Sequence, residues 1–518
     1  REPHSYHLNL PRAARGAERA MSVPSVLAID QGTTGTTCLV IGENGAVLGR
    51  SYSEFTQHFP QPGWVEHDAM EIWEVTRRVA REALDAASEA EVIAIGITNQ
   101  RETFVLWDRE TLEPLHRAIV WQDRRTTEMC KELKAAGHEA DVQARTGLVL
   151  DPYFSGTKIA WLLNSDPALR ARAEAGELAV GTIDSWLIAR LTNGAVHATD
   201  PTNASRTLLY HLTDAAWDPS LLELLGVPQS LLPDVRASAG DFGTSVGEHL
   251  GIEVPIAGVA GDQQAALFGQ GCWEAGLAKN TFGTGAFLLL NTGAEAVPST
   301  RGLLTTAACD AEGGLAYALE GSVFIAGAAV QWLRDGLGLL DAAPDSEAMA
   351  QALDDNGGVY FVPAFVGLGA PHWEPEARGM LVGLTRGTSK EHLVRAALEA
   401  MAYGTAEVLA AMEADSGVET TELRVDGGAA LNDWLMQLQA DVLDIPVRRP
   451  ALVETTALGA AGLAGIATGV WLSASDFLGV QAEGATRYAP SMGEEARTQL
   501  TSQWDRAVRA AVRWAQDV

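Results

Sequence analysis

A carboxylate stands directly before a turn rich in glycine and threonine near the start of the chain, in DQGTTGTT at residues 30–37. An aspartate at a strand end can hold Mg²⁺ directly or through water, while the N–H groups and hydroxyls of such a turn approach phosphate oxygens. Asp30 is therefore a candidate magnesium ligand. Thr33, Thr34 and Gly35 are candidate phosphate contacts. The alternative is an ordinary hairpin turn, because the same residue types are common in turns.

A second turn of this kind, GTGAF at residues 283–287, lies between two predicted strands in the other half of the chain. Taken alone it is more typical of a plain hairpin. Two such turns facing each other across a cleft would instead surround a phosphate chain with backbone donors. We expect an acidic protein that binds a nucleotide to rely on such donors and on Mg²⁺ rather than on a basic patch.

Asp262 lies between a predicted buried strand and the start of a helix, in VAGDQQAAL at residues 259–267. An aspartate at the carboxyl end of a strand, beside an inter-domain cleft, can take a proton from a substrate hydroxyl during phosphoryl transfer. The alternative is a helix N-cap, a role that aspartate fills well. These residues alone leave both hypotheses open.

Arg101 and Glu102 end another predicted buried strand, in TNQRET at residues 98–103. A substrate with several hydroxyls needs a hydrogen-bond donor beside an acceptor, and this pair supplies both. A surface ion pair is the alternative. Further along, VDGGAALND at residues 425–433 combines a strand, a glycine turn and a helix start. Glycine lets the backbone approach a flat ring or a ribose closely, although a helix cap explains the same pattern.

Apolar runs of strand length alternate with segments of helical period, which is typical of an α/β protein. A first group of predicted elements comprises strands at 25–30, 36–41 and 91–98 and a helix at 69–87. A second group comprises strands at 254–262, 279–293, 313–321 and 421–429 and a helix at 388–412. The repetition predicts two similar α/β halves that meet near residue 265, and ligand clefts commonly form at such interfaces.

The composition excludes several functional classes. The chain has 518 residues with 37 basic and 67 acidic side chains, a formal charge of −30, which disfavours nucleic acid and anionic membranes as partners. Its four cysteines lie far apart, which fits neither a disulfide framework nor a zinc site and indicates a reducing cytosol. No Gly-Lys dipeptide occurs, so a Walker A loop is excluded. The charge-free stretch 455–475 is rich in small residues and predicts a buried helix rather than a membrane span.

Taken together, the motifs resemble the FGGY family of carbohydrate kinases, and within it the members that phosphorylate glycerol. The resemblance runs from about Ser25 to Trp471. Family-level signatures are YFSGTKIAWLLNS (153–165) and GMLVGLTRGTSKEHLVRAALE (379–399). The stretches that are similar to the glycerol-phosphorylating members are DQGTTG, PGWVEHD, TNQRET, IVWQDRRT, GVAGDQQAALFGQ, NTFGTGAF, VFIAGAAVQWLRD, VPAFVGLGAPHW and VDGGAALND.

The resemblance implies an α/β fold of two actin-like, ribonuclease-H-like ATPase domains with a cleft between them. It implies an N-terminal domain at 24–268 that binds glycerol and phosphate, and a C-terminal domain at 269–518 that binds the nucleotide. Residues 1–23 show no periodic pattern and are predicted to be a disordered extension, with Met21 as the natural start. The implied activity is cytoplasmic, Mg²⁺- and ATP-dependent phosphorylation of glycerol to sn-glycerol 3-phosphate. Related proteins are commonly homodimers or homotetramers.

The resemblance also implies a role for individual residues. It assigns glycerol binding to Arg101, Glu102, Tyr153, Asp262 and Gln263, with Phe287 as an apolar wall. Asp262 is implied to be the general base, and Asp30 and Asp262 to lie at the Mg²⁺. The implied phosphate contacts are Thr33, Thr34, Gly35 and Thr284, and the other implied nucleotide contacts are Gly327, Gln331, Gly428 and Asn432.

Two departures from the family pattern qualify these expectations. Many glycerol-phosphorylating members have arginine where this chain has Thr37, so we expect weaker ATP affinity but the same reaction. The segment 240–255 lacks the basic, glycine-rich loop through which some members bind a sugar bisphosphate, which argues against that regulation. Two rival functions are a pentulose kinase, disfavoured by the Arg101–Glu102 pair, and a non-catalytic actin-like switch, disfavoured by retention of both Asp30 and Asp262.

Overall fold

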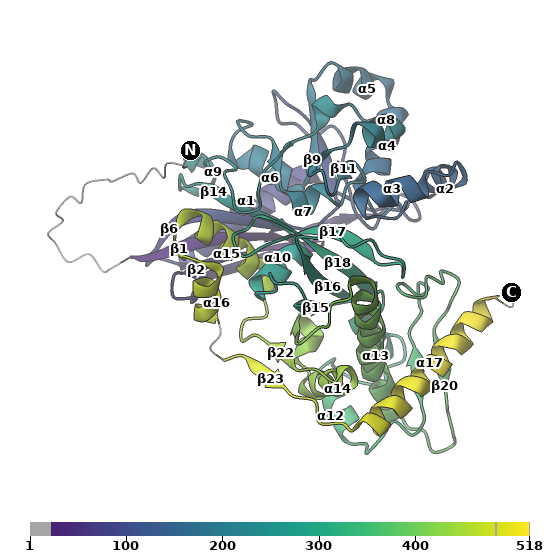
Figure 1. Ribbon diagram of the computed structural model, residues 1–518. Coiled ribbons are helices and arrows are strands. Elements are labelled where there is room, and N and C mark those ends of the chain that lie inside the picture. Colours follow the sequence, from purple (N-terminus) through teal and green to yellow (C-terminus); the bar gives the residue numbers. More distant parts are fainter. Residues whose placement is uncertain (1–21, 482–483, 517–518) are drawn as a thin grey trace, which may run out of the picture.

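The computed structural model describes residues 22–481 and 484–516, and two mixed sheets organise them (Figure 1). The predicted disordered extension at 1–23 lies almost entirely outside the described residues. Its last residue, Val23, already belongs to the first strand. The four cysteines are buried free thiols.

The first sheet has five strands in the order β14, β6, β1, β2, β3. Their bounds are Ile256–Gly261, Ala90–Asn99, Val23–Gln31, Gly35–Gly42 and Val47–Glu54. β1, β2 and β3 form an antiparallel meander, whereas β6 runs parallel to both β1 and β14. Helix α1 (Ala69–Ala86) begins at Asp68, whose carboxylate caps the helix by accepting the N–H groups of Met70 and Glu71. The strands and the helix predicted for this region are confirmed.

The second sheet has seven strands in the order β17, β18, β16, β15, β21, β22, β23. Their bounds are Leu304–Cys309, Leu315–Val323, Ala286–Gly293, Ala278–Phe282, Leu423–Asp426, Val447–Arg449 and Thr486–Tyr488. β15, β16 and β18 form an antiparallel meander, and β21 runs parallel to β15 and β22. Five of its strands, β18, β16, β15, β21 and β22, repeat the arrangement of the first sheet, so the predicted similarity of two α/β halves is confirmed. The grouping of the predicted strand at 254–262 with the second half is wrong, because that strand is β14 and pairs with β6 in the first sheet.

Smaller elements surround the two sheets. A further five-stranded sheet contains β4 (Gln57–His58), β5 (Glu66–His67), β8 (Ala118–Ile119), β7 (Phe104–Asp108) and β9 (Leu178–Thr182). Short strand pairs are β10 (Ala198–Thr199) with β13 (Asp234–Val235), β11 (Tyr210–His211) with β12 (Ala216–Trp217), and β19 (Tyr360–Val362) with β20 (Met380–Val382). Two 3₁₀ turns span Gln229–Leu231 and Gly428–Leu431.

The remaining helices fall into two groups along the chain. Before β15 they are α2 (Thr127–Ala135), α3 (Glu139–Thr146), α4 (Ser155–Ser165), α5 (Pro167–Glu174), α6 (Ile183–Leu191), α7 (Pro201–Ala204), α8 (Pro219–Leu225), α9 (Gly247–Leu250) and α10 (Asp262–Gly269). After β16 they are α11 (Gly327–Asp335), α12 (Asp345–Gln351), α13 (Lys390–Ser416), α14 (Asp433–Leu443), α15 (Thr455–Thr468), α16 (Ala474–Gln481) and α17 (Glu494–Gln516).

Helix α15 forms from the apolar, small-residue stretch and packs against the first sheet, beside β1 and β6 (Figure 1). Close contacts of α15 require glycine, both with α10 and with the sheet. A Cβ on Gly459 would lie 1.8 Å from the carbonyl oxygen of Ala265 in α10. A Cβ on Gly96 in β6 would lie 2.1 Å from the carbonyl oxygen of Ala460. The prediction of a buried helix is confirmed for residues 455–468, whereas the end of the stretch leaves the helix and exposes Leu472. Within the described residues no helix is long and apolar enough to cross a membrane.

Asp184 in α6 is a fully buried carboxylate, and it makes the free energy of unfolding of the protein depend on pH. It accepts hydrogen bonds from Thr182 Oγ1 at 2.5 Å and Thr199 Oγ1 at 2.6 Å. Burial and the nearby charge of Asp200 raise its pKa to about 7. Because the folded state then binds a proton that the unfolded state has released, stability falls as the pH rises from about 4 to about 7.

Replacement of this carboxylate with a neutral amide should flatten that dependence. We expect Asp184→Asn to reduce the fall in unfolding free energy by up to about 1.4 kcal/mol per pH unit in that window. The check is urea unfolding of both proteins at pH 5 and pH 7. Equal pH dependence in the two proteins would show that Asp184 titrates normally.

Candidate active site

Three neighbouring parallel strands of the first sheet end beside one another and carry the candidate acidic and basic residues. In the register of β1, β6 and β14, Asp30 lies opposite Thr98, and Thr98 lies opposite Ala260. Arg101 lies two residues after the end of β6, and Asp262 follows directly after β14. Residues far apart in the sequence therefore meet at one edge of the sheet, as expected for the carboxyl ends of parallel strands.

Asp262 and Arg101 form an ion pair at this edge. Nε of Arg101 lies 3.2 Å from Oδ1 of Asp262, which also accepts the N–H of Gln263 at 2.7 Å. The arginine side chain is 2% exposed and the aspartate side chain 30% exposed, so the carboxylate still reaches solvent. Gly261 allows this approach, because a Cβ there would lie 2.7 Å from Cγ of Arg101. Asp262 is thus an accessible carboxylate at a helix start, oriented by a buried cation.

Asp30 lies within the electrostatic reach of Asp262. Burial and the charge of Asp262 together raise the pKa of Asp30 to about 7. Two carboxylates that repel each other in this way suit a divalent cation, and Mg²⁺ is commonly bound by one or two carboxylates with waters and substrate phosphates. Among the described residues no group of three or more potential ligands stands ready for a metal. The donor set therefore fits Mg²⁺ that arrives with a phosphate, rather than a metal held by protein alone.

Glu102 adopts a backbone conformation that is uncommon outside glycine, with φ of 61°. Its carbonyl oxygen accepts the hydroxyl of Ser155 at 2.7 Å, which supports this turn. Its Oε1 accepts Nε of Arg206 at 2.6 Å, and no hydrogen bond to its Oε2 is found within the described part of the chain. Burial raises the pKa of this carboxyl, although Arg206 and Arg101 oppose the shift. One carboxylate oxygen thus remains available as an acceptor.

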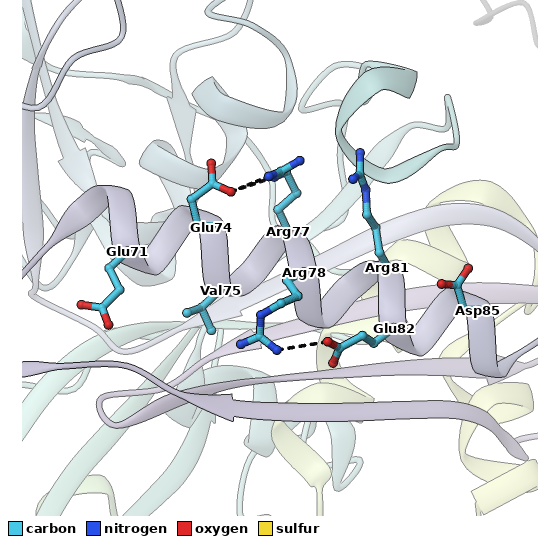
Figure 2. A pocket seen from close by; sticks show the side chains of 8 residues that line it. All are labelled: Glu71, Glu74, Val75, Arg77, Arg78, Arg81, Glu82 and Asp85. Atoms are coloured by element: carbon cyan, nitrogen blue, oxygen red, sulfur yellow. Dashed lines mark hydrogen bonds and ion pairs between the residues drawn. The ribbon is translucent and has the colours of Figure 1, made fainter.

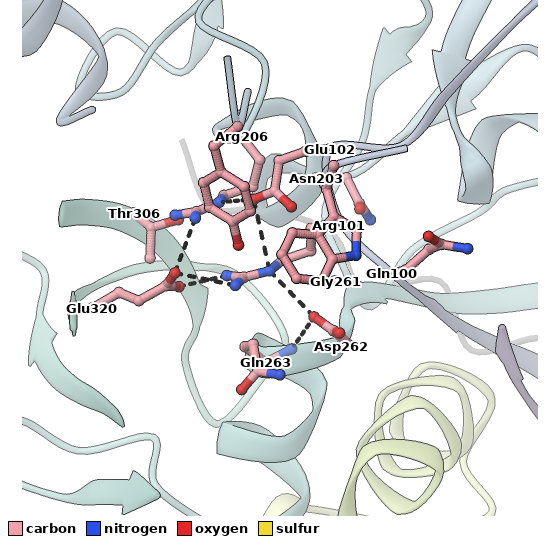
Figure 3. A network of polar contacts seen from close by, with 12 residues as sticks. Gln100, Arg101, Glu102, Asn203, Arg206, Gly261, Asp262, Gln263, Thr306 and Glu320 are labelled. Atoms are coloured by element: carbon pink, nitrogen blue, oxygen red, sulfur yellow. Dashed lines mark hydrogen bonds and ion pairs between the residues drawn. The ribbon is translucent and has the colours of Figure 1, made fainter. Parts of the chain in front are cut away.

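Arg206 and Glu320 complete a network that the sequence predictions missed. Figure 3 shows both side chains converging with Arg101, Glu102 and Asp262. Arg206 follows α7, and Glu320 lies in the middle of β18 in the second sheet. A single glutamate inside the otherwise apolar run LAYALEGSV was the available signal, because a buried carboxylate needs a partner.

An aromatic pair borders the same site. The rings of Tyr153 and Trp121 meet edge to face with centroids 5.6 Å apart. Nε1 of Trp121 donates to Oγ1 of Thr33 at 2.9 Å, so this wall is tied to the glycine and threonine turn after β1. Phe287 is half-buried in β16, where it pairs with Thr281 and Ser322 on the neighbouring strands.

Lys279 is another buried group near the site that the sequence predictions missed. It lies in β15 and donates from Nζ to Oε1 of Gln263 and to Oγ1 of Thr281, the latter at 2.8 Å. Burial lowers its pKa to about 8, although Asp426 and Asp262 oppose the shift. The second sheet therefore contributes a cation that holds the predicted ligand Gln263.

The second glycine and threonine turn rests on the start of α11. The carbonyl oxygen of Thr284 accepts the N–H groups of Ala326 at 2.9 Å and Ala328 at 3.1 Å, and that of Gly283 accepts the N–H of Gly327 at 3.0 Å. A Cβ on Gly327 would lie 2.6 Å from the carbonyl oxygen of Gly283. The structure thus brings the predicted residues Thr284 and Gly327 together.

Of the other predicted nucleotide contacts, Gly428 and Asn432 follow β21, whereas Gln331 lies in α11. A Cβ on Gly428 would meet no atom within 4 Å, so space is open there. Gln331 is an exposed residue of α11. Asn432 is the N-cap of α14 and accepts the N–H of Leu435 at 2.9 Å, so the helix-cap interpretation of VDGGAALND also holds. Its side-chain amide N–H₂ donates to Oγ of Ser346 at 3.5 Å.

A surface hollow elsewhere carries no comparable chemistry. Figure 2 shows that its lining side chains all project from α1. Four of its charged side chains pair with one another, since Arg77 lies 2.5 Å from Glu74 and Arg78 lies 3.0 Å from Glu82. The convergence at the strand ends therefore remains the candidate active site.

Comparisons with known proteins agree with this geometry. Models of the FGGY family of carbohydrate kinases match residues 25–269 for the N-terminal domain and 278–468 for the C-terminal domain. The chain is 56% identical over 492 residues to the glycerol kinase of Dechloromonas aromatica, covering 95% of this chain and 98% of that protein. It is also 56% identical over 494 residues to the glycerol kinase of Deinococcus radiodurans, with 95% and 98% covered.

Solved structures show the same fold. The structure of Plasmodium falciparum glycerol kinase with ADP superposes with a TM-score of 0.90 at 36% identity, covering 95% of this chain and 98% of that chain. The gluconate kinase of Lactobacillus acidophilus superposes with a TM-score of 0.84 at 21% identity, covering 95% and 99%, which supports the fold alone.

Proposed function

Because the chain belongs to the FGGY family of carbohydrate kinases, we propose that it transfers the γ-phosphoryl group of ATP to glycerol, forming sn-glycerol 3-phosphate at the entry to glycerol catabolism. The observation that carries this proposal is the buried Arg101–Glu102 pair beside the accessible carboxylate of Asp262. A donor, an acceptor and a base suit a small polyol better than an apolar substrate. The relatives at 56% identity are glycerol kinases, which supports the same substrate.

In this proposal the acceptor lies over the strand ends of the first sheet. Glu102 accepts one hydroxyl through its free Oε2, and Arg101 donates to another. Gln263 contacts a third hydroxyl from the start of α10. Tyr153 and Phe287 face the carbon chain, because aromatic rings bury apolar surface while leaving the hydroxyls to polar partners.

Asp262 is the proposed general base. It would accept the proton of the terminal hydroxyl as that oxygen attacks the γ-phosphorus, while the bond from the γ-phosphorus to the bridging oxygen of ADP breaks. Arg101 orients the carboxylate through the contact at 3.2 Å. The 30% exposure of the carboxylate supports its access to a substrate.

Asp30, with Asp262 nearby, would hold Mg²⁺. When bound, this cation would neutralise charge on the transferred phosphoryl group. Thr33, Thr34 and Gly35 on one side and Thr284 on the other would donate to phosphate oxygens. Gly327, Gln331, Gly428 and Asn432 would contact the rest of the nucleotide, and the open space at Gly428 supports this placement.

ADP production from Mg-ATP tests the function directly. The acceptor panel is glycerol, dihydroxyacetone, xylulose, ribulose and gluconate, with a reaction lacking an acceptor as control. We expect strong preference for glycerol, with glycerol 3-phosphate as the product. Preference for a pentulose would keep the fold but overturn the acceptor assignment, and acceptor-independent hydrolysis alone would favour an ATP-driven switch. The cytoplasmic location and a homodimeric or homotetrameric assembly remain predictions.

Thr37→Arg should tighten ATP binding. Thr37 in β2 lies directly opposite Asp30 in β1, so an arginine there would reach the proposed phosphate site. One charge-assisted hydrogen bond corresponds to a KM for ATP lower by about tenfold. Thr37→Gln, which adds length without charge, is the matched control. An unchanged KM in the arginine variant would refute the contact.

A further inference from the structure

Glu320 is a charged side chain in the middle of the second sheet, only 3% exposed. It pairs with Leu289 of β16 and Leu304 of β17 on the neighbouring strands. A carboxylate in such surroundings is costly unless cations and hydrogen bonds compensate for lost water. Both compensating cations, Arg101 and Arg206, come from the other half of the chain.

The contact with Arg101 has a specific geometry. Nη1 of Arg101 donates to Oε2 of Glu320 at 2.5 Å, and Nη2 donates to Oε1 at 3.1 Å. Two parallel hydrogen bonds fix both the position and the plane of a guanidinium group. With that edge occupied, the Nε edge of Arg101 is turned toward Asp262 at 3.2 Å. The orientation of Arg101 in the proposed pocket is therefore set from the second sheet.

Arg206 extends the same control to Glu102. Its Nη2 donates to Oε1 of Glu320 at 2.9 Å, and its Nε donates to Oε1 of Glu102 at 2.6 Å. Arg206 is fully buried, and the pKa of Glu320 is lowered to about 2 because the two guanidinium groups outweigh the effect of burial. Glu320 thus stays ionised and holds Arg101 directly and Glu102 through one intermediary.

We propose that Glu320 is a positioning residue for the acceptor pocket, holding Arg101 and, through Arg206, Glu102 in the orientation that binds the polyol. This inference rests on the proposed function. It assigns part of acceptor recognition to the half of the chain that carries the proposed nucleotide contacts. Loss of the Glu320 carboxylate should weaken glycerol binding and leave nucleotide binding unchanged. A general loss of stability would weaken both.

The test measures glycerol binding by titration calorimetry without nucleotide, and KM for glycerol and for ATP separately. Glu320→Gln should weaken glycerol affinity by about tenfold or more. Without the carboxylate, the paired charge-assisted hydrogen bonds to Arg101 are lost, and its guanidinium group is free to move. Glu320→Asp keeps the charge but withdraws it by one methylene, and we expect it to lose glycerol affinity as well. The matched control is Glu399→Gln, since Glu399 is also buried and pairs with Arg395 at 2.8 Å in α13, away from the pocket.

The outcomes separate the inference from the proposed function. Wild-type glycerol affinity in both Glu320 variants would overturn the positioning role while leaving the proposed function intact. If Glu320→Asp keeps wild-type glycerol affinity while Glu320→Gln loses it, Glu320 contributes only its charge, and the positioning role is also overturned. A wild-type protein that neither binds nor phosphorylates glycerol would overturn the proposed function and this inference with it.

Discussion

Asp262→Asn should reduce kcat for glycerol phosphorylation by about 10²- to 10⁴-fold, the range that general-base catalysis supplies. The amide is nearly isosteric and can still accept the N–H of Gln263, so the start of α10 should persist. It cannot accept a proton from the attacking hydroxyl. Nucleotide binding should be largely retained, because the proposed contacts with the adenine and ribose lie in the second half of the chain.

The measurement is single-turnover phosphorylation with saturating glycerol and Mg-ATP, beside ADP binding by calorimetry. Asp166→Asn is the matched control, since Asp166 also stands at a helix start, where it caps α5 by accepting the N–H of Ala168 at 2.8 Å. This control should keep its full rate. A rate close to wild type in Asp262→Asn would remove Asp262 as the base.

Glycerol analogues that lack a hydroxyl should be rejected by about 10⁴-fold in kcat/KM, as in sites built to bond a buried hydroxyl. Propane-1,2-diol and propane-1,3-diol each remove one hydroxyl. The loss would leave Arg101 or Glu102 without its substrate partner at a site where both side chains are at most 2% exposed. Unpaired polar groups in such a place cost more than a missing contact at the surface.

Glu102→Gln identifies the hydroxyl that Glu102 accepts. Its side-chain oxygen can still accept from Arg206, but an amide N–H₂ replaces the free carboxylate oxygen. We expect kcat/KM for glycerol to fall steeply, whereas kcat/KM for the analogue that lacks the matching hydroxyl should change little. The ratio of the two kcat/KM values should therefore be smaller than in the wild-type enzyme. The wild-type enzyme assayed with each analogue is the reference. If the variant discriminates between glycerol and the analogues as strongly as the wild-type enzyme, Glu102 is not the group that accepts the hydrogen bond of that hydroxyl.

Local patterns in the sequence were sufficient for much of the fold. β1, β2, α1 and β6 lie where apolar runs and helical spacing predicted them, because each buries a continuous apolar surface. β17 was not predicted. Its sequence, LTTAAC, mixes two threonines, which favour strands, with two alanines, which do not, and pairing with β18 makes it a strand.

The candidate chemical groups were recognisable in the sequence because each stands at a junction between a strand and a turn or helix. Asp30 lies at the end of β1, and Arg101 and Asp262 follow β6 and β14; parallel pairing of these strands then brings their ends together. Their types and local positions were thus determined by the sequence alone. Resemblance to a family supplied their individual roles, which short patterns do not contain.

Only the tertiary structure revealed Arg206, Lys279 and Glu320. Each is an isolated charge near a helix end or within a strand. Each has a partner on a different element, more than 100 residues away for the contacts of Arg206 with Glu102 and Glu320. Sequence spacing carries no information about such contacts, because they form only when separate elements pack together, and those of Glu320 only when the two halves of the chain meet. What the sequence determined by itself was the set of groups at the strand ends; their orientation depends on buried charges that the fold brings in from elsewhere.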